Sequence, residues 1–260
     1  MTTLGRRSRG DKGTGRGPGE APGPPVANRS VTRALSILQM LGRSDGPMAL
    51  GELATQLKLP KSSALSLLRA LVGAEFCVVD ENGLYALGLH SFEVGAAYLR
   101  TMTPVRSVTP ELRWLTETLG VTSHFAVLDD DEVVYLAKHD PPGLGLKLAS
   151  SLGARLPAAV TAVGKAQLAF RAARGVATPA GDVGGPLGTV RHMGYAVDEG
   201  QTAMGIRCVA APVFTDRGCG GALGVSYLLG GGPAEAAVVD AVLAAAGRAS
   251  ARLGGLGVRL

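Results

Sequence analysis

The chain has 260 residues, of which 46% are hydrophobic and 4% aromatic, and its formal net charge is +5. This length allows two domains that each have a hydrophobic core. The first 33 residues hold seven Lys or Arg and two Asp or Glu, so they carry the whole net charge and the remainder sums to zero. A basic segment on an otherwise neutral chain favours nucleic acid, rather than an acidic small substrate, as the partner.

Cysteine usage and hydropathy exclude several other classes. The three cysteines, Cys77, Cys208 and Cys219, are an odd number without a C-x-x-C pair, which argues against a disulfide scaffold or a zinc ribbon. They suit a reducing compartment, so we expect a cytoplasmic protein associated with the nucleoid. The basic start lacks an apolar signal-peptide core, and the Ala/Val-rich run 234–246 is too short to span a bilayer. We therefore expect no contact with membranes.

Residues 1–28 are rich in Gly, Pro and Arg and lack the apolar side chains of a folded core. Two interpretations stay open: a flexible, disordered arm that contacts phosphates or the minor groove, or an inert tail. If the arm contacts DNA, its deletion lowers the affinity and flattens the salt dependence of binding.

Three consecutive helices are predicted after the arm. The first covers residues 30–41, with Asn28 or Ser30 as the candidate N-cap. In the second, apolar residues recur at i, i+3, i+4 and i+7 within 50–57. Pro60 ends that helix and can start the third, because proline disfavours helical geometry before it but tolerates the first turn.

The third helix has a polar face that suits DNA. Lys61, Ser62, Ser66 and Arg69 fall away from its apolar positions, and small hydroxyls and cations fit a helix in a major groove. Two short β-type runs then flank the Asn-Gly pair at 82–83, the strongest short hairpin signal. This order predicts a winged helix-turn-helix. The alternative is a helical hairpin packed on a β-ribbon that binds no nucleic acid.

The rest of the chain alternates helices and strands. Helices are expected at 90–100, 112–119, 160–171 and 233–253, and strands at 121–128, 132–138, 145–149, 190–197, 206–214 and 221–228. Pro104 and Pro110 bracket a junction, and Gly120 is a candidate C-terminal cap. The Gly/Pro-rich stretch 174–188 gives no clear pattern. A sheet flanked by helices indicates the α+β class.

Several strings resemble one family of bacterial transcription factors, the isocitrate-lyase-regulator (IclR) family. They are SVTRALSILQML, LGELATQLKLPKSSALSLLRAL, GLYALGLHSFEVG, GARLPAAVTAVGKAQLA, GYAVDEGQTAMGIRCVAAPVF and GALGVSY. The resemblance covers roughly residues 29–258. It implies a winged helix-turn-helix DNA-binding domain at 29–89, a linker helix at 90–107 and a GAF-like or profilin-like effector-binding domain at 108–258. It also implies a homodimer or a tetramer built as a dimer of dimers.

For a double-stranded DNA operator, phosphate contacts are expected from cations and base contacts from hydroxyls. The cations are Arg29, Lys58, Lys61 and Arg69, and the hydroxyls belong to Ser62, Ser63 and Ser66. The sequence departs from the family at Leu65-Ser66, where many members have His-Arg, and at Leu84, where the wing often has Arg. Fewer cations weaken the electrostatic part of binding, so we expect the basic arm to compensate.

For a small-molecule effector, an organic acid or an aromatic metabolite, the resemblance implies a pocket between the sheet and the start of helix 160–171. The residues that match its lining are Ala162, Val163, Asp198, Ile206, Cys208 and Ser226, with Phe125, Leu146 and Leu148 as candidate apolar walls. A helix start offers unpaired N–H groups that suit a carboxylate. Cys208 is alternatively a buried structural thiol, and Asp198 a carboxylate that caps a turn.

Two other function classes are weighed against the ligand-responsive regulator. One is an enzyme with Cys208 as nucleophile and His124 as its base; the other is an architectural DNA binder that ignores sequence. The histidines show no paired metal-ligand spacing, and Val163-Gly164-Lys165-Ala166 lacks the first Gly and the Ser/Thr of a phosphate loop. We expect no enzyme, no cofactor and no metal. Whether the protein activates or represses is not encoded in these patterns.

Overall fold

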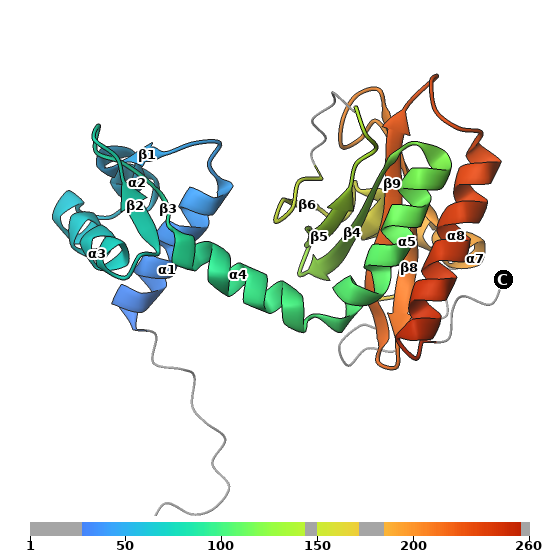
Figure 1. Cartoon of the computed structure of the whole chain (residues 1–260), viewed down its shortest axis with the longest axis horizontal. Coiled ribbons are helices and arrows are strands. Elements are labelled where there is room, and N and C mark those ends of the chain that lie inside the picture. The colour runs from blue at the N-terminus through green and yellow to red at the C-terminus, as the bar shows by residue number, and fades with distance from the viewer. Residues whose placement is uncertain (1–27, 144–149, 172–184, 256–260) are drawn as a thin grey trace, which may run out of the picture. The chain divides into compact units, whose positions relative to one another are not determined.

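The computed structural model describes residues 28–143, 150–171 and 185–255, and it divides between Leu89 and His90 into two compact units (Figure 1). Most of the predicted arm and the predicted strand 145–149 therefore lie outside the described residues. Helices and antiparallel sheets occur in both units, which confirms the α+β class. Within the described ranges, no helix has the length and apolar character needed to cross a membrane.

The first unit is the predicted winged helix-turn-helix. Its elements are α1 (Arg29–Arg43), β1 (Met48–Ala49), α2 (Leu50–Gln56), α3 (Lys61–Gly73), β2 (Cys77–Val79) and β3 (Leu84–Leu87). The three strands form an antiparallel sheet in the order β1-β3-β2. The helices enclose a small core that includes Ile37, Leu53, Leu68 and Tyr85.

Local sequence explains both ends of this unit. Asn28 caps α1, because its side-chain oxygen accepts hydrogen bonds from two backbone N–H groups of the first turn at 3.1 and 3.4 Å. At the wing, the Asp80 carboxylate accepts from the backbone N of Asn82 at 2.9 Å and of Leu84 at 2.8 Å. Gly83 has a φ of 75°, which glycine adopts without strain. The Asn-Gly pair thus forms the predicted hairpin turn.

The second unit is a sheet covered by helices on both faces. Its helices are α4 (Leu89–Thr101), α5 (Thr103–Leu119), α6 (Ala162–Leu168), α7 (Pro186–Met193) and α8 (Glu235–Arg252). Its strands are β4 (Thr122–Asp129), β5 (Glu132–His139), β6 (Arg155–Pro157), β7 (Ala196–Glu199), β8 (Ile206–Thr215) and β9 (Gly218–Leu228). In the described part of the chain, these strands form one antiparallel sheet in the order β6-β5-β4-β9-β8-β7.

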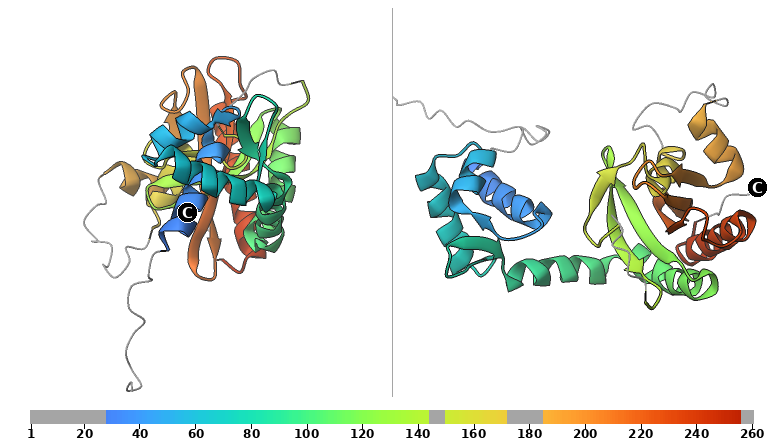
Figure 2. Two further views of the ribbon diagram at one scale, coloured as in Figure 1. Left: turned by 90° about the vertical axis from the view of Figure 1, so that its left-hand side faces the viewer. Right: turned by 90° about the horizontal axis from the view of Figure 1, so that it is seen from above.

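Each face of this sheet has its own core. α5 and α8 lie side by side on one face (Figure 2), where Leu112, Phe125 and Val242 are buried together. α6 packs on the other face, where Ala126 and Val163 belong to a second cluster. Neighbouring strand residues point to opposite faces, so Phe125 and Ala126 contribute to different cores. Burial of this apolar surface is the main favourable term in folding.

Three sequence predictions need correction in this unit. Residues 190–197 are not one strand: α7 ends at Met193, Gly194 adopts a left-handed φ of 78°, and only then does β7 begin. The helix predicted at 160–171 is shorter, because Thr161 caps it and α6 ends at Leu168. Pro110 does not mark a junction but lies inside α5.

A candidate DNA-binding face and a candidate effector pocket

One face of α3 is open to solvent. Lys61, Ser62, Ser66 and Arg69 are exposed, whereas Ala64 and Leu68 are fully buried against the unit's core. The helix begins directly after Pro60, whose fixed φ of −56° suits this position. The observed face carries the polar side chains that the sequence predicted for base and phosphate contacts. Ser63 lies at its edge and is half-buried.

The remaining predicted cations are also accessible. Arg29, in the first turn of α1, and Lys58, between α2 and α3, are exposed. Among the described residues, no carboxylate forms an ion pair with Arg29, Lys58, Lys61 or Arg69. Lys58 has a left-handed φ of 53°, a conformation that L-residues adopt at some cost in energy. These charges are therefore free to neutralise phosphates.

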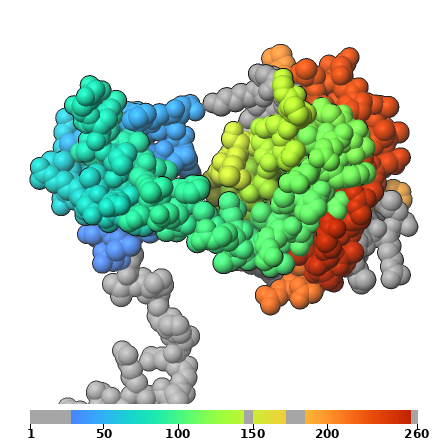
Figure 3. All heavy atoms as spheres, viewed as in Figure 1, coloured from blue at the N-terminus to red at the C-terminus, as the bar shows by residue number. Residues whose placement is uncertain are grey.

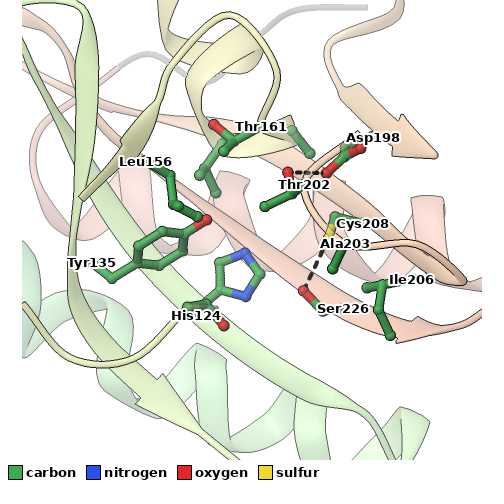
Figure 4. A pocket seen from close by; sticks show the side chains of 13 residues that line it. His124, Tyr135, Leu156, Thr161, Asp198, Thr202, Ala203, Ile206, Cys208 and Ser226 are labelled. Atoms are coloured by element: carbon green, nitrogen blue, oxygen red, sulfur yellow. Dashed lines mark hydrogen bonds between the residues drawn. The ribbon is translucent and has the colours of Figure 1, made fainter. Parts of the chain in front are cut away.

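In the second unit, a pocket lies between the sheet and the start of α6 (Figure 4). Its lining is His124, Tyr135, Ser150, Leu156, Thr161, Ala162, Val163, Asp198, Thr202, Ala203, Ile206, Cys208 and Ser226. The cavity measures about 20 Å³, which is room for about one water molecule. A larger ligand needs these walls to separate.

The pocket brings together most of the residues that were predicted to bind an effector. Those in the lining are Ala162, Val163, Asp198, Ile206, Cys208 and Ser226. Phe125 is a correction: it is fully buried in the core under α5 and α8, because it follows His124 on β4 and so points to the opposite face. Leu146 and Leu148 lie outside the described residues.

Asp198 holds a turn at the edge of the pocket. Its carboxylate is 1% exposed and accepts a hydrogen bond from the backbone N of Gln201 at 2.8 Å. The Thr202 hydroxyl donates to the other carboxylate oxygen. Lys165 of α6 reinforces the same region, since its Nζ donates to the carbonyl of Val197 at 3.0 Å. Asp198 thus makes the contacts of a carboxylate that caps a turn, which was one of the two interpretations drawn from the sequence.

Cys208 and Ser226 form a pair on adjacent strands. They are direct partners in the β8–β9 register, and Sγ lies 3.1 Å from the serine Oγ. Burial raises the pKa of the Cys208 thiol to about 11, so it stays protonated at neutral pH. A protonated thiol is a weak nucleophile. Although His124 lines the same pocket as a possible base, Cys208 is therefore an apolar part of the lining with one weak polar contact.

His124 is the most unusual side chain of the pocket. It projects from β4 and is 2% exposed, and its ring meets that of Tyr135 edge-on with centroids 5.3 Å apart. Burial, followed by the nearby Lys138 charge, lowers the pKa of His124 to about 4. The imidazole is therefore neutral at pH 7. Its Nδ1 is buried and has no hydrogen-bond partner.

Several pocket residues were missed in the sequence. Tyr135, Ser150, Leu156, Thr161, Thr202 and Ala203 were not predicted, and His124 was considered only as the base of a nucleophilic cysteine. Strand alternation linked the two errors, because placing Phe125 in the pocket turned its neighbour His124 away from it. Thr161 had a signal, since threonine before an apolar helical run is a typical N-cap.

Comparison with known proteins matches both units to one protein family. A model of the IclR helix-turn-helix domain matches residues 30–80, and a model of the C-terminal domain of the bacterial transcriptional regulator IclR matches residues 96–178. The transcriptional repressor IclR of Escherichia coli K12 is 33% identical over 223 residues, which cover 78% of this chain and 81% of that repressor. The chain belongs to the IclR family.

Solved IclR-family structures share the fold. The IclR regulator of Alicyclobacillus acidocaldarius is 27% identical with a TM-score of 0.74, over 87% of this chain and 99% of that one. An IclR homolog of Microbacterium hydrocarbonoxydans, solved with 4-hydroxybenzoate, is 19% identical with a TM-score of 0.72, over 86% and 98% respectively. As a family member, the chain is a DNA-binding transcription regulator rather than an enzyme.

Proposed function

We propose that this protein is a ligand-responsive transcriptional regulator whose operator binding is modulated by a small organic acid or aromatic metabolite. The observation that carries the proposal is a pocket lined by buried polar side chains in a chain that also has an open recognition helix. The Microbacterium relative was solved with an aromatic hydroxy acid, and the E. coli relative is a repressor. We therefore favour repression, in the cytoplasm at the nucleoid.

The contacts proposed for the operator lie on the first unit. Phosphates are neutralised by Arg29, Lys58, Lys61 and Arg69, and base edges are contacted by Ser62, Ser63 and Ser66, with the arm 1–28 adding further phosphate contacts. The effector contacts are Ala162, Val163, Asp198, Ile206, Cys208 and Ser226. The proposed domain limits are 29–89, 90–107 and 108–258.

We also propose that the regulator binds DNA as a homodimer. Among the described residues, none of those in α4 is buried, and its Leu89, Phe92 and Val94 side chains are 66%, 71% and 60% exposed. The helix is visible along the surface in Figure 3. Apolar surface of this kind is stabilised by a partner helix. Two subunits place two recognition helices on one palindromic operator.

The proposal is tested in two steps. Binding sites are selected from a random duplex library, and operator binding is then titrated with pairs of organic acids that differ by one hydroxyl or keto oxygen. We expect a two-fold symmetric site, tight binding in the presence of random competitor DNA, and a change in affinity with at least one acid. Equal affinity for all duplexes would instead support the sequence-blind architectural binder. Alkylation of the cysteines is the control for the enzyme alternative: it would abolish an activity that depends on the Cys208 thiolate, whereas operator binding by the first unit should survive it.

A further inference from the structure

Two polar side chains of the pocket are buried without a partner. His124 is 2% exposed and Ser150 is 5% exposed, and both line the same cavity. Neither His124 Nδ1 nor Ser150 Oγ has a hydrogen-bond partner. A buried polar atom that is left unpaired destabilises the folded state. Among the described residues, His139, Arg207 and Tyr227 also have such an atom, but only His124 and Ser150 line the pocket, where a bound molecule can complete the hydrogen bonds.

Several other polar groups around them are already engaged. Asp198 accepts from the turn that carries Thr202, and Cys208 contacts Ser226, as the dashed lines in Figure 4 show. The Thr161 hydroxyl accepts from the backbone N of the third residue of α6 at 3.0 Å. The Tyr135 hydroxyl also lacks a hydrogen bond to any described residue, but only at His124 and Ser150 is the unpaired lining atom itself fully buried.

The chemistry at these positions is neutral. Neutral imidazole has one N–H donor and one acceptor nitrogen, and the serine hydroxyl both donates and accepts. Because burial keeps His124 uncharged, it offers no attraction specific for a carboxylate. None of the described lining residues is Lys or Arg. The group that fits here is a hydroxyl or keto oxygen, which takes the place of one water molecule in a cavity of about 20 Å³.

We propose that His124 and Ser150 form a neutral polar subsite that binds a hydroxyl or keto oxygen of the effector. The subsite makes the pocket selective for a hydroxy or oxo acid over the same acid without that oxygen. An analogue without the oxygen fills the pocket but leaves both buried atoms unpaired, so it binds more weakly. This inference rests on the proposed function, because it assumes that the effector occupies this pocket.

The test measures binding of paired acids to the full-length protein by calorimetry. The pairs are benzoate and 4-hydroxybenzoate, phenylacetate and 4-hydroxyphenylacetate, propionate and lactate, and propionate and pyruvate. In at least one pair, we expect the oxygenated acid to bind about tenfold more tightly. His124→Leu and Ser150→Ala should each reduce this preference. The matched controls are Ser151→Ala and His192→Leu, at exposed positions outside the pocket, which should retain it.

Thermal unfolding separates a binding role from a structural one. His124→Leu removes an unpaired buried polar group, so the midpoint temperature should rise by about 3 °C while the preference is lost. A histidine with a purely structural role would give a lower midpoint and an unchanged ratio between paired acids.

The outcomes distinguish this inference from the proposed function. The subsite is refuted if acids bind the protein and cause it to release the operator, but the two members of every pair bind equally. It is also refuted if the preference survives in both variants. In either case the proposed function as a ligand-responsive regulator still stands. If no acid of the panel binds, both fail together. A preference that is lost in both variants and retained in both controls supports the subsite.

Discussion

Gly164 in the first turn of α6 is a position where one methyl group should disturb the effector pocket. A Cβ added there would lie 2.1 Å from the carbonyl oxygen of Ala158 and 2.4 Å from its Cα. Ordinary carbon contacts lie near 3.5 Å, so α6 and this backbone must separate by about 1 Å. Because backbone cannot rotate away as a side chain can, we expect Gly164→Ala to cost about 3 kcal/mol.

The pocket should respond as well, since Ala162 and Val163 line it from the same turn. Trp114 is the single tryptophan of the sequence and lies in α5, so its fluorescence reports unfolding of the second unit. We expect a loss of about 6–12 °C in the midpoint temperature and a weaker response of operator binding to acids.

Gly247→Ala is the matched control for this substitution. A Cβ at this exposed position of α8 meets no atom within 4 Å, so the change should stabilise the helix by about 1 kcal/mol. If Gly164→Ala unfolds at the wild-type temperature and keeps its response to acids, the close approach of α6 to Ala158 is not a constraint and the reasoning fails.

Three further predictions concern charge. Lys61→Gln should reduce the magnitude of the slope of log K for operator binding against log salt by about 0.9. Arg113→Gln in the second unit should leave the slope unchanged. Deletion of residues 1–27, which keeps the Asn28 cap of α1, should lower affinity and flatten the slope further; an unchanged slope would contradict a DNA-binding arm. The pKa of His124 is about 4 in the folded chain and near 6.5 in the unfolded chain, so unfolding takes up a proton between these pH values. The stability that depends on the neutral imidazole is complete above pH 6.5 and is lost as the pH falls toward 4. Urea titrations at about pH 7 and about pH 4 should show that the free energy of unfolding falls by roughly 3 kcal/mol through this group, and His124→Leu should lack that part of the fall.

The first unit was largely predictable because its signals are local. Helical spacing, Pro60 and the Asn82-Gly83 pair each act within a few residues of the structure they determine. The observed α1, α2 and α3 accordingly follow the predicted order, with Asn28 as the observed cap. A polar face on α3 follows from the same spacing, because the apolar positions of a helix determine which residues remain outside.

The second unit was predictable in its strands and less so in its connections. The strands at 206–214 and 221–228 were found from their apolar runs, whereas the last four residues of α7 were predicted as the start of a strand. Its residues 190–193 carry little periodicity, and the boundary depends on Gly194 in the left-handed region. The short strand β6 was not predicted, since only its pairing with β5 defines it.

By itself, the sequence determined the class of molecule: a basic arm, a winged helix-turn-helix with a polar recognition helix, and an α+β second half. The family resemblance named six residues of the pocket, but only the tertiary structure decided which other side chains share it. The β8–β9 pairing places Ser226 beside Cys208, and the packing of β4 between two helical layers puts His124 in the pocket and Phe125 in the opposite core. Whether a buried polar atom has a partner depends on every element packed around it, and no local pattern records that. The unpaired state of His124 and Ser150 is therefore a property of the fold.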